Sequence, residues 1–280
     1  MKTVGLLNAS AAEFIGTFIL VFFGVGSVHV AVLTGALAGL GQVAAVWGVG
    51  IALAIYATGS ISGAHMNPAI TLVFAALRRF PPARILPYVA SQLAGAMAAA
   101  AVLYALFGGC IADFEAAHGL VRGGPGSELS AMMYGEYFPN PAMVQGEHPT
   151  LGGITMTGAM AAEGIGTALL AFFVFAMTDR RNGGRPNGTF AALFIGLAVA
   201  VIISILAPLT QAGLNPARDF APRVLAYFAG WGPIAIPGPR GGFFTVYILA
   251  PVIGAMAGAA AYQFIVRPGL PAETAEAKAA

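Results

Sequence analysis

Long apolar runs separated by short polar segments make up most of the chain. A bilayer core of about 30 Å takes roughly 20 helical residues to cross. Six runs reach this length, and we predict a transmembrane helix in each: residues 10–32, 40–59, 83–107, 158–178, 189–208 and 244–265. Two further apolar segments, 68–78 and 216–227, reach only about half way across, roughly 16 Å. They predict buried or re-entrant half-helices.

The same pattern occurs twice along the chain. Residues 12–22 and 162–172 are identical at seven of eleven positions, and an Asn-Pro-Ala triplet recurs 148 residues after its first occurrence. We therefore predict a first repeat at about 9–107 and a second at about 158–267. Each repeat holds three spans, an odd number, so the second is inverted relative to the first. Inverted repeats with broken helices near the midplane mark a transport pathway.

These two repeats predict one transmembrane channel domain, residues 1–267. Nine of the thirteen Lys and Arg residues share one side if both termini face the cytoplasm, and this bias predicts that orientation. The connection 108–157 is then outside, and its length predicts that it folds over the pore mouth. The Ala-rich end, 268–280, is predicted to be a disordered cytoplasmic tail.

Composition narrows the class of protein. The chain is 58% hydrophobic and only 9% charged, whereas soluble domains carry about 25% charged residues. A soluble α/β domain is therefore disfavoured. The net charge of +2 is too small to indicate a nucleic-acid partner. One cysteine excludes an intrachain disulfide, and we find no metal-ligand spacing, no sign of a cofactor and no pairing of nucleophile and base that would indicate an enzyme.

The two Asn-Pro-Ala triplets predict helix starts. Asn67 and Asn215 are strong N-cap residues, and Pro68 and Pro216 occupy the favoured first helical position. One such triplet would be an ordinary cap, but two at matching places in an inverted repeat bring two helix N-termini together at mid-membrane. Their dipoles then repel cations, and the Asn amides offer donors to a passing oxygen atom.

The segments 62–71 and 213–223, which contain the triplets, resemble those of the major intrinsic protein (aquaporin) family, and the resemblance extends from about residue 9 to residue 267. Asp219, directly after Arg218, is typical of the glycerol-conducting branch. Motifs in the outer connection are similar to those of bacterial glycerol facilitators: residues 113–115, 120–123 and 138–141. The resemblance implies an all-α membrane fold of six transmembrane helices plus two re-entrant half-helices. It also implies a homotetramer with one pore per subunit in the inner or plasma membrane.

Two acids lie within predicted spans. An intramembrane acid is energetically unfavourable and seldom accidental. Glu13 and Glu163 occupy equivalent repeat positions, which disfavours the alternative that both are residues snorkelling near span ends. The resemblance implies that they accept hydrogen bonds from the irregular backbone before each half-helix. With Pro68, Pro216 and Asp219 they are predicted as structural supports.

The resemblance places a selectivity constriction at Trp47, Ile203, Ala212 and Arg218. Alternative roles are an interface anchor for Trp47 and a purely structural pair with Asp219 for Arg218. Glycerol facilitators carry a second aromatic residue where this chain has Ala212, and a glycine where it has Ile203, so the set looks more like that of the nodulin-type plant intrinsic proteins. The carbonyls implied to line the pore belong to Gly63, Ala64, His65, Gln211, Ala212 and Gly213, although a merely satisfied bend is an alternative for them.

The implied function is a passive channel for small uncharged solutes: glycerol first, then urea, other short polyols and water, with ions and protons excluded. A channel of the same fold for urea or undissociated metalloid acids, such as arsenite or borate, is the main alternative. A strict water channel fits Asp219 and Ala212 less well. A coupled secondary transporter would need more ionisable groups along its pathway than the spans contain.

Overall fold

The computed structural model describes residues 4–78, 80–144 and 153–271, and all regular structure in that part of the chain is helical. Six helices are long and apolar enough to cross a membrane. Their bounds are α1 Leu6–Thr34, α2 Leu40–Ser62, α4 Ile85–Ala117, α7 Met156–Thr178, α8 Ala191–Thr210 and α10 Ala250–Ala261, the last flanked by wider helical turns at Thr245–Leu249 and Tyr262–Val266. The predicted all-α fold with six spans is confirmed.

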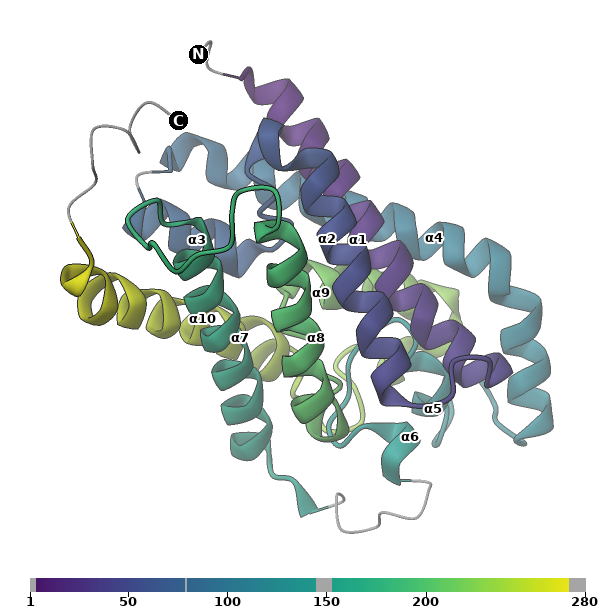
Figure 1. The fold of residues 1–280 in the computed structure, drawn as a ribbon. Coiled ribbons are helices and arrows are strands. Elements are labelled where there is room, and N and C mark those ends of the chain that lie inside the picture. The colour runs from purple at the N-terminus through teal and green to yellow at the C-terminus, as the bar shows by residue number, and fades with distance from the viewer. Residues whose placement is uncertain (1–3, 79, 145–152, 272–280) are drawn as a thin grey trace.

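Two shorter helices stand where the half-helices are predicted. They are α3, Pro68–Leu77, and α9, Pro216–Ala226. Within its own repeat α3 packs against α4, and α9 packs against the helical turn Thr245–Leu249 that precedes α10; Figure 1 shows α3 beside α10. The two halves also interlock, because α3 packs against α10 and α9 packs against α4.

Close helix contacts depend on glycine at equivalent places in the two repeats. Helix α1 packs on α4, where a Cβ atom on Gly95 would lie 2.3 Å from the carbonyl oxygen of Phe14. Helix α7 packs on α10, where a Cβ atom on Gly254 would lie 2.0 Å from the carbonyl oxygen of Gly164. Without hydrophobic attraction between helices in lipid, such close backbone approach is a main source of packing energy.

Helix α4 ends ten residues later than predicted. Its expected end was residue 107, before two glycines, yet the helix runs to Ala117. Glu115 in the added part accepts hydrogen bonds from Arg122 at 2.8 Å and from Ser130 at 2.7 Å. These contacts stabilise three further turns, which glycine alone does not interrupt. The outer connection also contains two short helices, α5 Glu128–Ala131 and α6 Pro141–Val144.

Both described ends of the chain lie on one face of the bundle. The guanidinium of Arg84 donates to the Val4 carbonyl at 2.8 Å, and that of Arg181 donates to the Leu270 carbonyl at 2.7 Å. Nη2 of Arg78, directly after α3, lies 3.7 Å from Oδ2 of Asp179, directly after α7, and this ion pair joins the two loops that begin there. Residues 272–280, most of the predicted tail, lie outside the described residues, as do three cations used for the orientation: Lys2, Arg79 and Lys278.

Candidate functional site: a pore through the bundle

The two half-helices begin in the same way. The side-chain oxygen of Asn67 accepts a hydrogen bond from the backbone N–H of Ala69 at 2.9 Å, and Asn215 does the same for Ala217 at 3.0 Å. A proline follows each cap at the first helical position. Both helix starts therefore satisfy part of their free N–H groups through the triplet itself.

The triplets also hold each other. The amide nitrogen of Asn67 donates to the Leu214 carbonyl at 3.0 Å, and that of Asn215 donates to the Met66 carbonyl at 2.8 Å. The two N-termini therefore meet in the middle of the bundle. An Asn amide group carries two N–H bonds, so each retains one donor beyond this cross-link. Both Asn side chains line the larger cavity described below.

The backbone before each half-helix is irregular and is held by a buried acid. Ala64 and Met66 in one turn, and Gln211, Ala212 and Leu214 in the other, adopt left-handed conformations with φ between 49° and 63°. Such conformations are unfavourable for residues other than glycine and need support from their surroundings. The turns leave backbone N–H groups that no helix can satisfy.

Glu13 and Glu163 supply the acceptors. Glu13 receives hydrogen bonds from the N–H groups of His65 at 2.8 Å and Met66 at 2.7 Å. Glu163 receives them from Gly213 at 2.9 Å and Leu214 at 2.7 Å. Both carboxylates are fully buried. Their positions are therefore those of backbone anchors in the two repeats, away from span ends.

Two cavities meet at the predicted constriction. The first, of about 330 Å³, extends from Tyr56 and Gly188 past the two Asn caps. The second, of about 240 Å³, lies against Met132 and Asn140 of the outer connection. Both are lined by the same three side chains, which therefore form the boundary between them: Trp47, Ile203 and Arg218.

The aromatic wall of the constriction depends on a glycine. Trp47 is 5% exposed and lies inside the bundle, so the interface-anchor alternative is wrong. Its indole ring packs against Gly24, where a Cβ atom would come within 2.3 Å of the ring. The guanidinium of Arg218 lies 4.4 Å from the ring centre on the pore side, a distance typical of cation–π contacts.

The remaining predicted pore residues differ in position. Ala212 lines the first cavity together with Gly63, Ala64, His65 and Gly213. Gln211 instead lines the second cavity, and its side chain contacts the outer connection. The predicted pore-lining carbonyl residues are therefore divided between the two cavities.

Arg218 does not pair with Asp219, and that alternative is wrong. Asp219 binds Arg223 on the same helix, with Oδ1 2.7 Å from Nη2 and Oδ2 3.0 Å from Nε. Side chains four residues apart lie on one helix face, whereas adjacent ones point in different directions. The partner of Arg218 is Glu136, in the outer connection, and the two form a buried ion pair.

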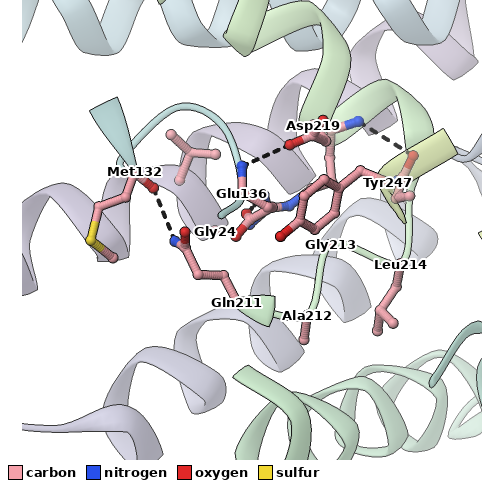
Figure 2. A network of polar contacts seen from close by, with 12 residues as sticks. Gly24, Met132, Glu136, Gln211, Ala212, Gly213, Leu214, Asp219 and Tyr247 are labelled. Carbon is pink, nitrogen blue, oxygen red and sulfur yellow. Dashed lines mark hydrogen bonds and ion pairs between the residues drawn. The ribbon is translucent and has the colours of Figure 1, made fainter. Parts of the chain in front are cut away.

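The outer connection is tied to the constriction by main-chain contacts (Figure 2). Figure 2 shows the N–H of Glu136 pointing at Asp219, 2.7 Å from Oδ1, and the Gln211 amide donating to the Met132 carbonyl at 3.1 Å. The N–H of Tyr137 donates to the Gln211 side-chain oxygen at 2.8 Å. Burial raises the pKa of the Tyr137 hydroxyl, which stays neutral and donates to the Ile234 carbonyl at 3.0 Å.

Sequence reasoning missed two residues of this site. Gly24 carries no motif, and only its distance to the Trp47 ring reveals its role. Glu136 stands two residues before the family-like segment 138–141, and it is one of five acids in the outer connection. Its nearness to that segment was the only available signal.

The chain matches the model of the major intrinsic protein family over residues 1–262. It is 42% identical to the glycerol uptake facilitator protein of Haemophilus influenzae, over 92% of this chain and 94% of that protein. It is 41% identical to the propanediol uptake facilitator PduF of Citrobacter freundii, over 94% of this chain and 93% of that protein.

Among solved structures, the fold is similar to that of the aquaglyceroporin from Plasmodium falciparum. The TM-score is 0.79 at 24% identity, and the match covers 94% of this chain and 98% of that one. The family match over most of the sequence, together with relatives above 40% identity along nearly their whole length, shows that this chain belongs to the major intrinsic protein family.

Proposed function

We propose that the protein is a passive channel for small uncharged solutes, chiefly glycerol, and that water and urea also pass. The observation that carries this proposal is the pair of cavities meeting end to end at Trp47, Ile203 and Arg218. Relatives named as glycerol and propanediol uptake facilitators support it. The channel is an integral protein of the cell membrane, with both termini in the cytoplasm, and assembles as a homotetramer.

The lining of the first cavity suits short polyols. Ile51, Ile55, Leu170 and Val199 form apolar walls, along which the carbon edge of a diol can slide. The free N–H bonds of Asn67 and Asn215 offer donors to its hydroxyl oxygens. Cations meet the positive ends of both half-helices at this point, and we assign their exclusion to these dipoles.

Glu13 and Glu163 argue against coupled transport. A proton-coupled carrier needs acids that exchange protons along the pathway. Here both carboxylates accept two backbone hydrogen bonds each, and each accepts a third from a side chain, Gln92 at 2.7 Å or Thr210 at 2.6 Å. Their lone pairs hold the turns in place and are not available to a solute.

Liposomes containing the purified protein test the proposal by light scattering after osmotic shocks with glycerol, propane-1,2-diol and urea, and by water efflux. We expect non-saturating glycerol flux at least tenfold above that of empty liposomes. Flux that saturates, or that concentrates solute against its gradient, would replace the channel by a carrier. No increase over empty liposomes for glycerol would remove glycerol as the chief solute.

A substitution at the constriction tests which solutes are limited there. Ala212→Phe places a ring in the first cavity beside Asn215, so glycerol and urea flux should fall more than water flux. Ala101→Phe, on the exposed face of α4, is the matched control and should leave all three unchanged. Equal loss of the three in Ala212→Phe would show that Ala212 is not at the limiting point.

A further inference from the structure

Glu136 belongs to the outer connection, and its side chain enters the second cavity beside Arg218. Its carboxylate pairs with the guanidinium of Arg218, and the two side chains are only 2% and 5% exposed. It lines the second cavity together with Trp47, Ile203 and Arg218. The acid is therefore part of the ring of side chains between the two cavities.

The backbone of Glu136 is fixed independently of its side chain. Its N–H donates to Asp219 Oδ1 at 2.7 Å, and its carbonyl accepts from Nη2 of Arg223. The preceding residue, Gly135, lies so close to Arg223 that a Cβ atom there would be 2.9 Å from the guanidinium carbon. The Asp219–Arg223 pair thus holds this segment of the outer connection against α9, and the carboxylate is directed at Arg218.

The pair changes the charge of the constriction. A lone buried guanidinium would present positive charge and donors only. Glu136 cancels that charge and places an acceptor beside the donors. One of its oxygens, Oε2, has no hydrogen-bond partner within residues 4–78, 80–144 and 153–271. Nη1 of Arg218 is likewise buried without a hydrogen-bond partner in the same described residues. Because a buried polar atom without a partner is unfavourable, both atoms would gain from a hydroxyl or N–H group of a solute in the second cavity, which the two side chains line.

We propose that Glu136 is a specificity-determining residue of the pore. Together with Arg218 it forms a neutral donor–acceptor pair that selects small molecules able both to accept and to donate hydrogen bonds, with vicinal diols first. This inference rests on the proposed channel function and deepens it. It also assigns cation exclusion to the half-helix dipoles and not to Arg218, whose charge is already cancelled.

Glu136→Gln tests the acceptor. The amide keeps the size of the side chain and both main-chain hydrogen bonds, so the fold should persist. Loss of the charged acceptor should lower glycerol and propane-1,2-diol flux at least threefold, with water flux changed less than twofold. Asp113→Asn is the matched control, because Asp113 is an exposed acid at the outer end of α4 and lines none of the three cavities. A glycerol-to-water ratio in Glu136→Gln within 1.5-fold of that in the control would overturn the role.

The charge is tested by opposite substitutions. Arg218→Gln leaves Glu136 unpaired and makes the constriction anionic, so methylammonium entry into liposomes should rise at least tenfold. The double variant Arg218→Gln with Glu136→Gln is neutral again and should return to the low rate of the unmodified protein. Equal methylammonium entry in the single and double variants would overturn the cancellation of charge.

Failure of this inference is distinguishable from failure of the channel proposal. The unmodified protein decides the channel, since glycerol flux in it is measured before any variant. If it conducts glycerol and the ratio in Glu136→Gln stays constant, only the role of Glu136 is lost. If it conducts water or urea but not glycerol, the glycerol assignment is lost, and the methylammonium comparison still decides whether Glu136 cancels Arg218.

Discussion

The half-helices α3 and α9 begin with the same triplet and then diverge in chemistry. Helix α3 continues with apolar residues almost throughout, whereas α9 carries Arg218, Asp219 and Arg223 among its first eight residues. The caps, the buried acids and the cross-linked amides are common to both. The scaffold is therefore symmetric, while the charged side chains of the two half-helices are all in α9.

Equivalent positions in the two half-helices show what the difference does. Thr71 stands where α9 has Asp219, four residues after the Asn cap in each case. The Thr71 hydroxyl accepts from Gln92 at 2.9 Å and donates to the Asn67 carbonyl at 3.0 Å, so it joins α3 to α4. Asp219 instead binds Arg223 and the outer connection. Thr71 therefore connects α3 to a neighbouring helix, whereas Asp219 connects α9 to the outer connection at the pore entrance.

The largest effect is expected from substitutions of the two buried acids that the repeats share. Glu13→Gln and Glu163→Gln each replace a charged acceptor by an amide that cannot serve two backbone N–H groups equally. Hydrogen bonds to charged groups contribute about 1.5–3 kcal/mol each, so each variant should lose roughly 3–6 kcal/mol of folding free energy. Denaturation of the purified protein in detergent measures this.

The two losses should be similar, since both acids hold equivalent turns. Asp113→Asn, on the exposed outer end of α4, is the control and should remain near the unmodified protein. A loss below about 1 kcal/mol in only one of the two Glu variants would show that the repeats do not share this support.

The difference between the two half-helices is tested at their equivalent positions, Asp219 in α9 and Thr71 in α3. Asp219→Asn leaves the buried Arg223 without its charged partner, and breaking such a pair typically destabilises by about 3–5 kcal/mol. Thr71→Val removes neutral hydrogen bonds and should destabilise by about 1–2 kcal/mol. The measurement is again unfolding in detergent. A larger loss in Thr71→Val would reverse the assignment of the two helices.

Glycerol flux in the same two variants distinguishes an effect on the outer connection at the pore entrance from an effect on helix packing. Asp219→Asn weakens the hold on Glu136 and should reduce flux severalfold among molecules that remain folded. Thr71→Val leaves the outer connection intact, so its flux per folded molecule should stay within about twofold of the unmodified protein. Equal flux in both variants would disconnect Asp219 from the pore mouth.

Much of this architecture is predictable from the sequence because lipid restricts what a chain can do. Only helices satisfy their backbone inside a bilayer, and their length is set by its thickness. The six spans, the two short helices and their inversion follow from those limits and from the repeated triplet. The end of α4 escaped prediction, since contacts of Glu115 with Arg122 and Ser130 decide it.

The partner of Arg218 could not be predicted in the same way. Asp219 is adjacent in sequence, but its direction on the helix takes it to Arg223. Glu136 reaches Arg218 through an outer connection without periodicity, where no pattern of spacing states which of five acids turns inward. Tertiary contacts alone select it.

A smaller effect is expected at Trp47, the aromatic wall of the constriction in the first repeat. Trp47 needs the space left by Gly24, whereas Val174 stands at the aligned position of α7. Gly24→Ala forces the indole out of its place, and overpacking of this kind destabilises by about 1–3 kcal/mol. The displaced ring should also lower glycerol flux more than water flux. Gly26→Ala on the same helix is the comparison, because a Cβ atom there meets only the end of the Leu103 side chain, at 3.3 Å. An identical flux profile in both variants would remove Gly24 from the constriction.

The smallest expected effect returns to the symmetric scaffold. The hydroxyl of Tyr88 donates to the Ser62 carbonyl at 2.9 Å, and that of Tyr247 donates to the Thr210 carbonyl at 3.2 Å. Tyr88→Phe and Tyr247→Phe each remove one neutral hydrogen bond at the end of the span before an irregular turn, for about 1 kcal/mol. The two sites share no partner, so the double variant should lose the sum of the single losses. A double variant that loses clearly more than this sum would show that the two turns are energetically coupled through the crossed Asn amides, and the halves of the scaffold would then act as one unit.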